Sequence, residues 1–273
     1  MMETISFHSY RGGVGKTLLS VNSAVKLANL EKKVCLVDFD LRAPSFQSYF
    51  SSNSIISRSM EEIPSFTEFL IGKAAPNEVI SHTNEKKFDC VFSDVEILQK
   101  STKVRSKLAQ HSEGRILAKL FEFIRYCTSE KYDFLIIDCM PGITFRSLDA
   151  LVVSDKIMVV TRPVKSEAKG LNLIISECYS KLEGANFYAV MNQIEAKKDL
   201  KFDPSPEDMK IAQSNLQEIS SILLESILKI PILYSFRRIP FVTERIYVLE
   251  DKEHPFSEEI AKFCDRILSI VNK

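Results

Sequence analysis

The chain has 273 residues, of which 45% are hydrophobic, so it can bury the core of one large α/β domain or two small ones. Its 36 basic residues balance 36 acidic residues, and no overall charge draws it to nucleic acid or anionic lipid. It has no signal-peptide core and no long apolar run, which predicts a cytoplasmic protein without a transmembrane segment. Because no linker or repeat interrupts the sequence, we predict that residues 1–273 form one domain.

A glycine-rich loop joins the first predicted strand to the first predicted helix. Thr4–Ser9 has strand character, Arg11–Thr17 reads RGGVGKT, and apolar residues recur at helical spacing from Leu18 onward. This order is typical of a phosphate-binding loop, in which backbone N–H groups and a helix N-terminus surround the anion. Lys16 would reach the β- and γ-phosphates, and the Thr17 hydroxyl would bind Mg²⁺. We predict nucleotide contacts from Arg11, Gly12, Gly13, Val14, Gly15, Lys16, Thr17 and Leu18.

Two further predicted strands end in acidic residues. Lys33–Asp38 has the pattern of a buried strand, and a second aspartate, Asp40, follows it. Tyr132–Asp138 is a nearly continuous apolar run, which is typical of a central parallel strand buried on both faces. Acidic residues at the carboxyl ends of such strands lie at the edge where ligands bind. Alone, Asp38 and Asp40 would indicate a polar strand end, but the glycine loop one strand earlier favours a functional role.

The segment between these two strands, residues 43–129, is less regular. We predict a short helix around residues 66–70, a strand at 88–92 and a helix over 114–127. A basic cluster in this segment is either a solvated face or a partner surface, and two other basic groups are equally ambiguous. The cluster is Lys100, Lys103, Arg105 and Lys107, and the other groups are Arg237 with Arg238 and Lys197 with Lys198 and Lys201.

Strands and helices continue to alternate after Asp138. We predict strands at Lys156–Pro163 and Phe187–Asn192, a helix at Lys165–Leu182, and a final helix at Glu258–Val271 with Ser257 as its N-cap. The alternation predicts an α/β fold: a doubly wound, mostly parallel sheet with helices on both faces. The six cysteines form no C-x-x-C pair, which argues against a zinc or iron–sulfur site and predicts small buried side chains.

The glycine loop and the acidic strand ends resemble those of the ParA/MinD superfamily of P-loop ATPases. The deviant Walker A loop of that family reads K-G-G-x-G-K-[ST]; here Arg11 replaces the first lysine, and Tyr10 stands where the standard loop has glycine. The sequence Asp38-Phe39-Asp40 resembles the family's switch I, and the D-x-x-P-G sequence 138–142 resembles its switch II.

This resemblance implies catalytic roles for three residues. Lys16 and Arg11 would balance phosphate charge, with Arg11 crossing a dimer interface to the ATP of the partner subunit. Asp40 would orient the attacking water. Gly142 would sense the γ-phosphate.

The resemblance also implies which residues bind the metal and the base. Thr17 and Asp138 would hold Mg²⁺, and Asp38 would support that site. Asn192, at the end of a predicted strand, would read the adenine edge, although asparagine at such a position is equally a turn former. Pro231, in the late Lys229-Ile230-Pro231 segment, would border the adenine.

The implied function is a slow, Mg²⁺-dependent ATPase that alternates between an ADP-bound monomer and an ATP-bound homodimer. It would act in partitioning or positioning DNA or a cellular structure, with non-specific DNA or an activating protein as candidate partners. Residues 268–273 have a core-helix pattern, so we expect no membrane-targeting helix, and no tyrosine-rich tail follows Tyr247. The alternatives are a nucleotide-gated adaptor with little hydrolysis, or a kinase-like or cofactor-maturation relative of the same fold.

Overall fold

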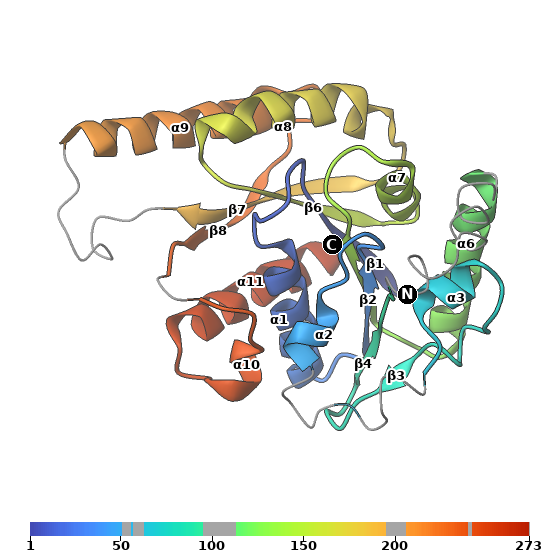
Figure 1. Ribbon diagram of the computed structural model, residues 1–273. Helices are drawn as coiled ribbons and strands as arrows, with labels where there is room; N and C mark the ends of the chain where they lie inside the picture. The colour runs from blue at the N-terminus through green and yellow to red at the C-terminus, as the bar shows by residue number, and fades with distance from the viewer. Residues whose placement is uncertain (51–55, 57–62, 95–112, 195–205, 240–241, 273) are drawn as a thin grey trace.

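The fold is built on an eight-stranded sheet (Figure 1). The computed structural model describes residues 1–50, 56, 63–94, 113–194, 206–239 and 242–272. The strand order is β3-β4-β2-β5-β1-β6-β7-β8, and only the β3–β4 pair among these strands is antiparallel. The predicted doubly wound, mostly parallel sheet is therefore confirmed. The strands are β1 (Glu3–His8), β2 (Val34–Phe39), β3 (Ser81–His82), β4 (Phe88–Val91), β5 (Phe134–Cys139), β6 (Lys156–Thr161), β7 (Asn186–Ile194) and β8 (Ile232–Arg237).

Helices cover both faces of the sheet, as Figure 1 shows. One face packs against α1 (Lys16–Asn29), α2 (Phe46–Phe50), α10 (Tyr247–Glu250) and α11 (Pro255–Val271). The other face packs against α3 (Phe66–Leu70), α6 (Glu113–Ser129), α7 (Phe145–Val152), α8 (Lys165–Glu177), a 3₁₀ helix η2 (Tyr179–Lys181) and α9 (Pro206–Glu225). Alternate residues of a strand serve opposite faces. In β1, Ile5 and Phe7 enter the α1 core, whereas Ser6 and His8 face α7 and η2.

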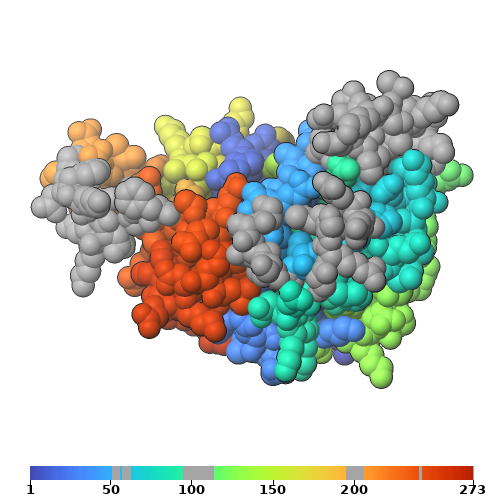
Figure 2. Space-filling model, turned by 60° about the horizontal axis from the view of Figure 1, so that its bottom comes forward, coloured from blue at the N-terminus to red at the C-terminus, as the bar shows by residue number. Residues whose placement is uncertain are grey.

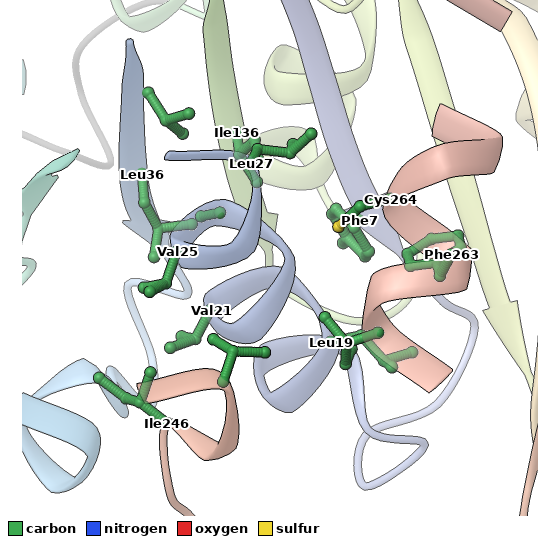
Figure 3. Packing of buried hydrophobic residues seen from close by; sticks show 14 of the residues in the cluster. Phe7, Leu19, Val21, Val25, Leu27, Leu36, Ile136, Ile246, Phe263 and Cys264 are labelled. Atoms are coloured by element: carbon green, nitrogen blue, oxygen red, sulfur yellow. The ribbon is translucent and has the colours of Figure 1, made fainter. Parts of the chain in front are cut away.

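Helix α1 begins at the glycine loop and is buried between the sheet and α11. Figure 3 shows α1 between the strands that carry Leu36 and Ile136 and the helix that carries Phe263. The rings of Phe7 and Phe263 meet edge-on, with centroids 6.2 Å apart. Each fully buried apolar side chain of this kind contributes about 1.5–3 kcal/mol. The packing therefore fixes the N-terminus of α1 at the carboxyl edge of the sheet.

The last two predicted helices begin or end at different residues from those expected. The final helix begins at Pro255 with His254 as its N-cap, because His254 Nδ1 accepts a hydrogen bond from Phe256 N at 3.1 Å. Ser257 lies inside the first turn and donates to Asp251 O, so the prediction that it is the N-cap was wrong. Helix α8 ends at Glu177, before Leu182, and a 3₁₀ turn follows it.

Several composition-based expectations can be compared with the described residues. All six cysteines are buried and free, as predicted. No helix among the described residues is long and apolar enough to span a membrane. The basic cluster formed by Lys100, Lys103, Arg105 and Lys107 lies outside the described residues, as do Lys197, Lys198 and Lys201.

Candidate nucleotide and magnesium site

The phosphate loop, residues 11–17, lies between the end of β1 and the start of α1. Gly15 is the N-cap of α1 and has φ +97°, a left-handed conformation that L side chains rarely adopt. Lys16 is the first residue of the helix and is buried. The free N–H groups of a helix N-terminus and the positive end of its dipole make this position suited to an anion. The contacts of the loop with phosphate, including that of Leu18 in the first turn of α1, stay a prediction.

Asn192, near the end of β7, holds the phosphate loop from the side. Its Nδ2 donates to the carbonyl oxygen of Val14 at 2.8 Å, and its Oδ1 accepts from Gln193 N at 2.9 Å. A Cβ on Gly15 would collide with the Asn192 amide, so glycine is required there by contact as well as by conformation. Asn192 is thus brought to the site, and its described bonds are to the protein backbone. Its contact with adenine stays a prediction.

Asp38 and Asp138 lie directly opposite each other on the paired strands β2 and β5. Asp138 Oδ2 accepts a hydrogen bond from Thr17 Oγ1 at 2.6 Å. Asp138 Oδ1 is buried and has no hydrogen-bond partner among the described residues. Asp38 instead binds the loop after β2, accepting from Asp40 N at 3.1 Å and from Ser45 N at 3.0 Å. The two carboxylates therefore differ: Asp138 has a free oxygen, and Asp38 orders the following loop.

Burial disfavours the charged form of both Asp38 and Asp138 relative to the protonated form. Burial raises the pKa of Asp138 from 3.8 to about 6, although the charge of Lys16 opposes the shift. Burial, reinforced by the charge of Asp138, raises the pKa of Asp38 well above its ordinary value. A divalent cation would offset this desolvation and repulsion, and hard oxygen donors are what Mg²⁺ prefers. The free Oδ1 of Asp138 beside the Thr17 hydroxyl therefore fits a magnesium ion.

Asp40 begins the loop that Asp38 orders. Its Oδ1 accepts from Arg42 N at 3.2 Å and from Ala43 N at 3.1 Å. The Ser45 hydroxyl in the same loop lies 3.5 Å from Thr17 Oγ1, which brings the loop next to the phosphate loop. Asp40 is half-buried and lies near Asp138, whose pKa its charge helps to raise. A carboxylate at this position can accept a proton or orient a polar group at the site.

Gly142, in the D-x-x-P-G segment, forms hydrogen bonds through both its N–H and its carbonyl oxygen. Its N–H donates to Ser9 O at 2.8 Å, next to the phosphate loop. Its carbonyl oxygen accepts from His8 Nε2 at 3.0 Å and from Ser147 Oγ at 2.7 Å. Its φ of +82° favours glycine at this turn. The D-x-x-P-G segment thus lies next to the phosphate loop, and in this structure the Gly142 N–H donates its hydrogen bond to Ser9 O.

Comparisons with known proteins agree with this geometry. A family model described as an AAA domain matches residues 2–186. The chromosome-partitioning ATPase Soj of Treponema pallidum is 25% identical over 186 residues, 68% of this chain and 67% of that protein. The septum site-determining protein MinD of Bacillus subtilis is 29% identical over 175 residues, 64% of this chain but only 59% of that protein. The structure of MinD from Pyrococcus horikoshii with Mg-ADP superimposes with a TM-score of 0.70 at 20% identity, covering 99% of this chain and 98% of that one.

The chain belongs to the ParA/MinD-type P-loop ATPases. Proteins of this type are generally ATPases.

Pro231, another predicted nucleotide-binding residue of this ParA/MinD-type chain, is positioned by a hydrogen bond to β7. Pro231 precedes β8, and its carbonyl accepts from Ala189 N at 2.8 Å. Strands β7 and β8 are parallel, so Pro231 lies at their amino end, whereas Asn192 lies towards the carboxyl edge. Pro231 thus lies directly before β8, while Asn192 lies further along the paired strand β7, and a contact of Pro231 with adenine stays a prediction. A second Ile-Pro pair, residues 239–240, follows β8, with Pro240 outside the described residues.

Another residue was missed by the sequence reasoning. Glu167, in the first turn of α8, is only 1% exposed, and its Oε1 lacks a hydrogen-bond partner among the described residues. Arg162 Nη2 lies 3.7 Å from that oxygen. Burial raises the pKa of Glu167, while the nearby charges of Arg162 and Arg11 oppose the rise. A buried carboxylate thus lies within the electrostatic reach of the phosphate loop.

Arg11 lies on the surface where the phosphate loop meets α8. Figure 2 shows the blue loop segment next to the yellow segment of α8. Tyr10 packs on Gly170 of α8 so closely that any side chain at residue 170 would collide with its ring. A cavity of about 390 Å³ opens there, lined by Tyr10, Arg11 and the α8 residues Ser166, Lys169, Gly170, Asn172, Leu173 and Ser176. Arg11 is therefore exposed at the rim of its own site.

Proposed function

We propose that this protein binds ATP with Mg²⁺ and hydrolyses it slowly. The free, buried Oδ1 of Asp138, next to its hydrogen bond with Thr17, is the observation that carries the proposal. A buried anion normally has its hydrogen bonds satisfied, so an unpaired oxygen at the end of a strand marks a place for a ligand. Magnesium bound there would neutralise charge on the transferred phosphoryl group.

Protein side chains would bind the phosphates, orient the attacking water and order the adjoining loop. Lys16, at the N-terminus of α1, would bind the phosphates through its ammonium group. Asp40 would orient the attacking water, while Asp38 would keep the Asp40–Ser45 loop ordered through its bonds to the backbone. Asp38 would also add negative charge near the metal, because it lies opposite Asp138. These roles rest on the family resemblance together with the observed positions.

We also propose that ATP drives formation of a homodimer. Arg11 is exposed at the junction of the phosphate loop and α8, whereas Lys16 of the same loop is buried. An exposed cation beside a phosphate site can reach a second subunit, and such cations accelerate phosphoryl transfer by ~10³–10⁵ in other systems. In a slow ATPase we expect the low end of that range. The names of the relatives, a partitioning ATPase and a septum-site protein, support a role in partitioning or positioning.

Mixing two inactive variants tests the shared site. Arg11→Ala should retain ADP affinity but lose ATP-dependent dimerisation and turnover, and Asp40→Ala should bind ATP, accumulate as a dimer and fail to hydrolyse it. A heterodimer of the two has one composite site with both groups intact, so mixing should restore part of the activity. Arg11→Lys, which keeps the charge, is the matched control and should retain much of the activity. Inactive mixtures in which heterodimers are demonstrated would refute action of Arg11 across the interface.

A further inference from the structure

A fully buried histidine lies directly before the phosphate loop. His8 is the last residue of β1 and is 0% exposed. Because β1 alternates its side chains, His8 projects to the face covered by α7, α8 and η2, away from α1. Its ring meets the ring of Tyr179 edge-on at a centroid distance of 5.7 Å. No role of a phosphate-loop ATPase described above accounts for an imidazole at this position.

The hydrogen bonds of His8 have a fixed direction. Burial lowers the pKa of His8 to about 3, so the imidazole is neutral at neutral pH and carries one N–H. Nε2 lies 3.0 Å from Gly142 O, which can only accept, so the proton is on Nε2. Nδ1 must then accept the hydrogen bond from Tyr179 Oη at 2.7 Å. The carbonyl of Gly142 therefore sets the tautomer, and the hydroxyl of Tyr179 stabilises it by donating to Nδ1.

These bonds hold both peptide groups that flank the Gly142 α-carbon. The carbonyl oxygen accepts from both His8 Nε2 and Ser147 Oγ, which uses both of its lone pairs. The N–H on the other side donates to Ser9 O at 2.8 Å. We call His8, Ser9, Ser147 and Tyr179 the Gly142 clamp. While the clamp is intact, the N–H of Gly142 points to the protein backbone and cannot bind a phosphate.

We propose that His8, held at Nδ1 by the Tyr179 hydroxyl, is a positioning residue that keeps Gly142 in a state that does not contact the γ-phosphate. The inference rests on the proposed function, since it concerns how the same site distinguishes ATP from ADP. Binding of a γ-phosphate by the Gly142 N–H requires that N–H to leave Ser9 O, and a shift of the whole residue towards the phosphate must also break the bond from His8 to its carbonyl. The clamp therefore opposes the ATP state and is indifferent to ADP, which lacks the γ-phosphate.

His8, which holds the Gly142 carbonyl, and Tyr179, which holds His8, are themselves fixed by packing and strand pairing. Tyr179 is 0% exposed and packs against Phe187 of β7 with ring centroids 5.0 Å apart. His8 itself belongs to a central strand that pairs with β6 at Val159. Ser9 and Gly142 both lie outside helices and strands, but Ser9 directly follows His8 of the central strand, whereas Gly142 lies in the turn between β5 and α7. When the network rearranges, Gly142 is thus the part that moves.

Tyr179→Phe tests the inference with little change in packing. The ring stays, but the hydroxyl that donates to His8 Nδ1 and holds the imidazole is lost. We would measure dissociation constants for ADP and for a non-hydrolysable ATP analogue, with Mg²⁺, at protein concentrations below those that give dimers. The preference for the ATP analogue over ADP should rise about fivefold, the ratio for a neutral hydrogen bond of about 1 kcal/mol. ADP affinity should stay the same.

Tyr132→Phe is the matched control. Tyr132 is also buried, and its hydroxyl donates to Asp89 Oδ2 at 2.6 Å near the amino end of β5, away from the phosphate loop. It should lose stability in the same way without changing the nucleotide preference. An equal change in both variants would show that the preference follows general stability, and an unchanged or reduced preference in Tyr179→Phe would also refute the inference.

His8 variants give a second, independent test. His8→Gln keeps an N–H donor for Gly142 O and should behave as the wild type, whereas His8→Leu removes the donor and should raise the preference for the ATP analogue. If His8→Gln and His8→Leu lower both affinities in parallel, His8 is only structural and the inference fails. A wild-type protein that binds neither nucleotide would instead refute the proposed function itself.

Discussion

Asp138→Asn should change how the stability of the metal-free protein depends on pH. The substitution keeps the shape of the side chain and an oxygen to accept the Thr17 hydrogen bond, but it removes a titrating carboxyl whose Oδ1 has no partner. Burial raises the pKa of Asp138 from 3.8 to about 6 in the folded protein. Folding therefore favours the protonated form of Asp138 when no metal is bound.

The sign of the effect follows from this raised pKa. Below about pH 4 the carboxyl is protonated in both the folded and the unfolded protein, and it costs nothing. As the pH rises to about 6, the unfolded chain has already lost the proton that the folded chain retains, so stability falls. A shift from 3.8 to about 6 corresponds to a total loss of about 3 kcal/mol, and about half of it falls between pH 5 and pH 7.

Urea unfolding of the metal-free and nucleotide-free protein at several pH values between 5 and 7 measures this loss. The wild type should lose about 1–2 kcal/mol more than Asp138→Asn across this range. Asp38 also has a raised pKa, to which the charge of Asp138 contributes, so the difference between the two proteins reports residue 138 together with its effect on Asp38. Asp133→Asn, on the exposed turn before β5, is the control and should follow the wild type. Identical pH profiles for wild type and Asp138→Asn would show that the carboxylate is not destabilised and would remove the argument for a metal at its free oxygen.

Two further substitutions test the charges around the phosphate loop. Lys16→Ala should abolish the stabilisation of the protein by MgADP, which in the wild type should be ~2.7 kcal/mol at a hundredfold excess of nucleotide over Kd. Lys26→Ala, in the last turn of the same helix, is the control and should retain this stabilisation. An unchanged thermal shift with MgADP in Lys16→Ala would contradict the assignment of Lys16 to the phosphates. Glu167→Gln should tighten ADP binding a few-fold at low salt, because it removes a buried negative charge near the loop. Calorimetry can compare it with Glu177→Gln at the exposed end of α8, and weaker binding by Glu167→Gln would show that this carboxylate assists the site.

The parts of the fold that the sequence predicted are those with strong local patterns. The central strands β2, β5 and β6 are continuous apolar runs whose residues are all buried, so hydrophobicity alone locates them. The phosphate loop is equally local, because its glycines and Lys16 are adjacent in the chain. The acidic residues at the ends of β2 and β5 could be placed together since parallel strands end at the same edge.

The features that the sequence did not predict depend on contacts between distant segments. Strand β8 is an edge strand with half-exposed and polar residues, so its burial pattern gives no strong signal of its limits. Glu167 is one charged residue in a helix with a mixed sequence, and only packing shows that it is buried. His8 lies 171 residues from Tyr179 and 134 residues from Gly142, which no local pattern connects.

The hydrogen bonds around the phosphate loop show how the fold orders the site before any ligand binds. The Asn192 amide holds the carbonyl of Val14, Gly142 N–H holds that of Ser9, and Asp138 holds the hydroxyl of Thr17. These three residues lie outside the loop: Asn192 is in β7, Asp138 is in β5, and Gly142 is in the turn that follows β5. Because the entropy of ordering the loop is lost during folding, less remains to be lost when a nucleotide binds. The same bonds couple the loop to β5, β7 and the Gly142 turn, so a ligand that moves one of these segments must also rearrange the bonds that hold the loop.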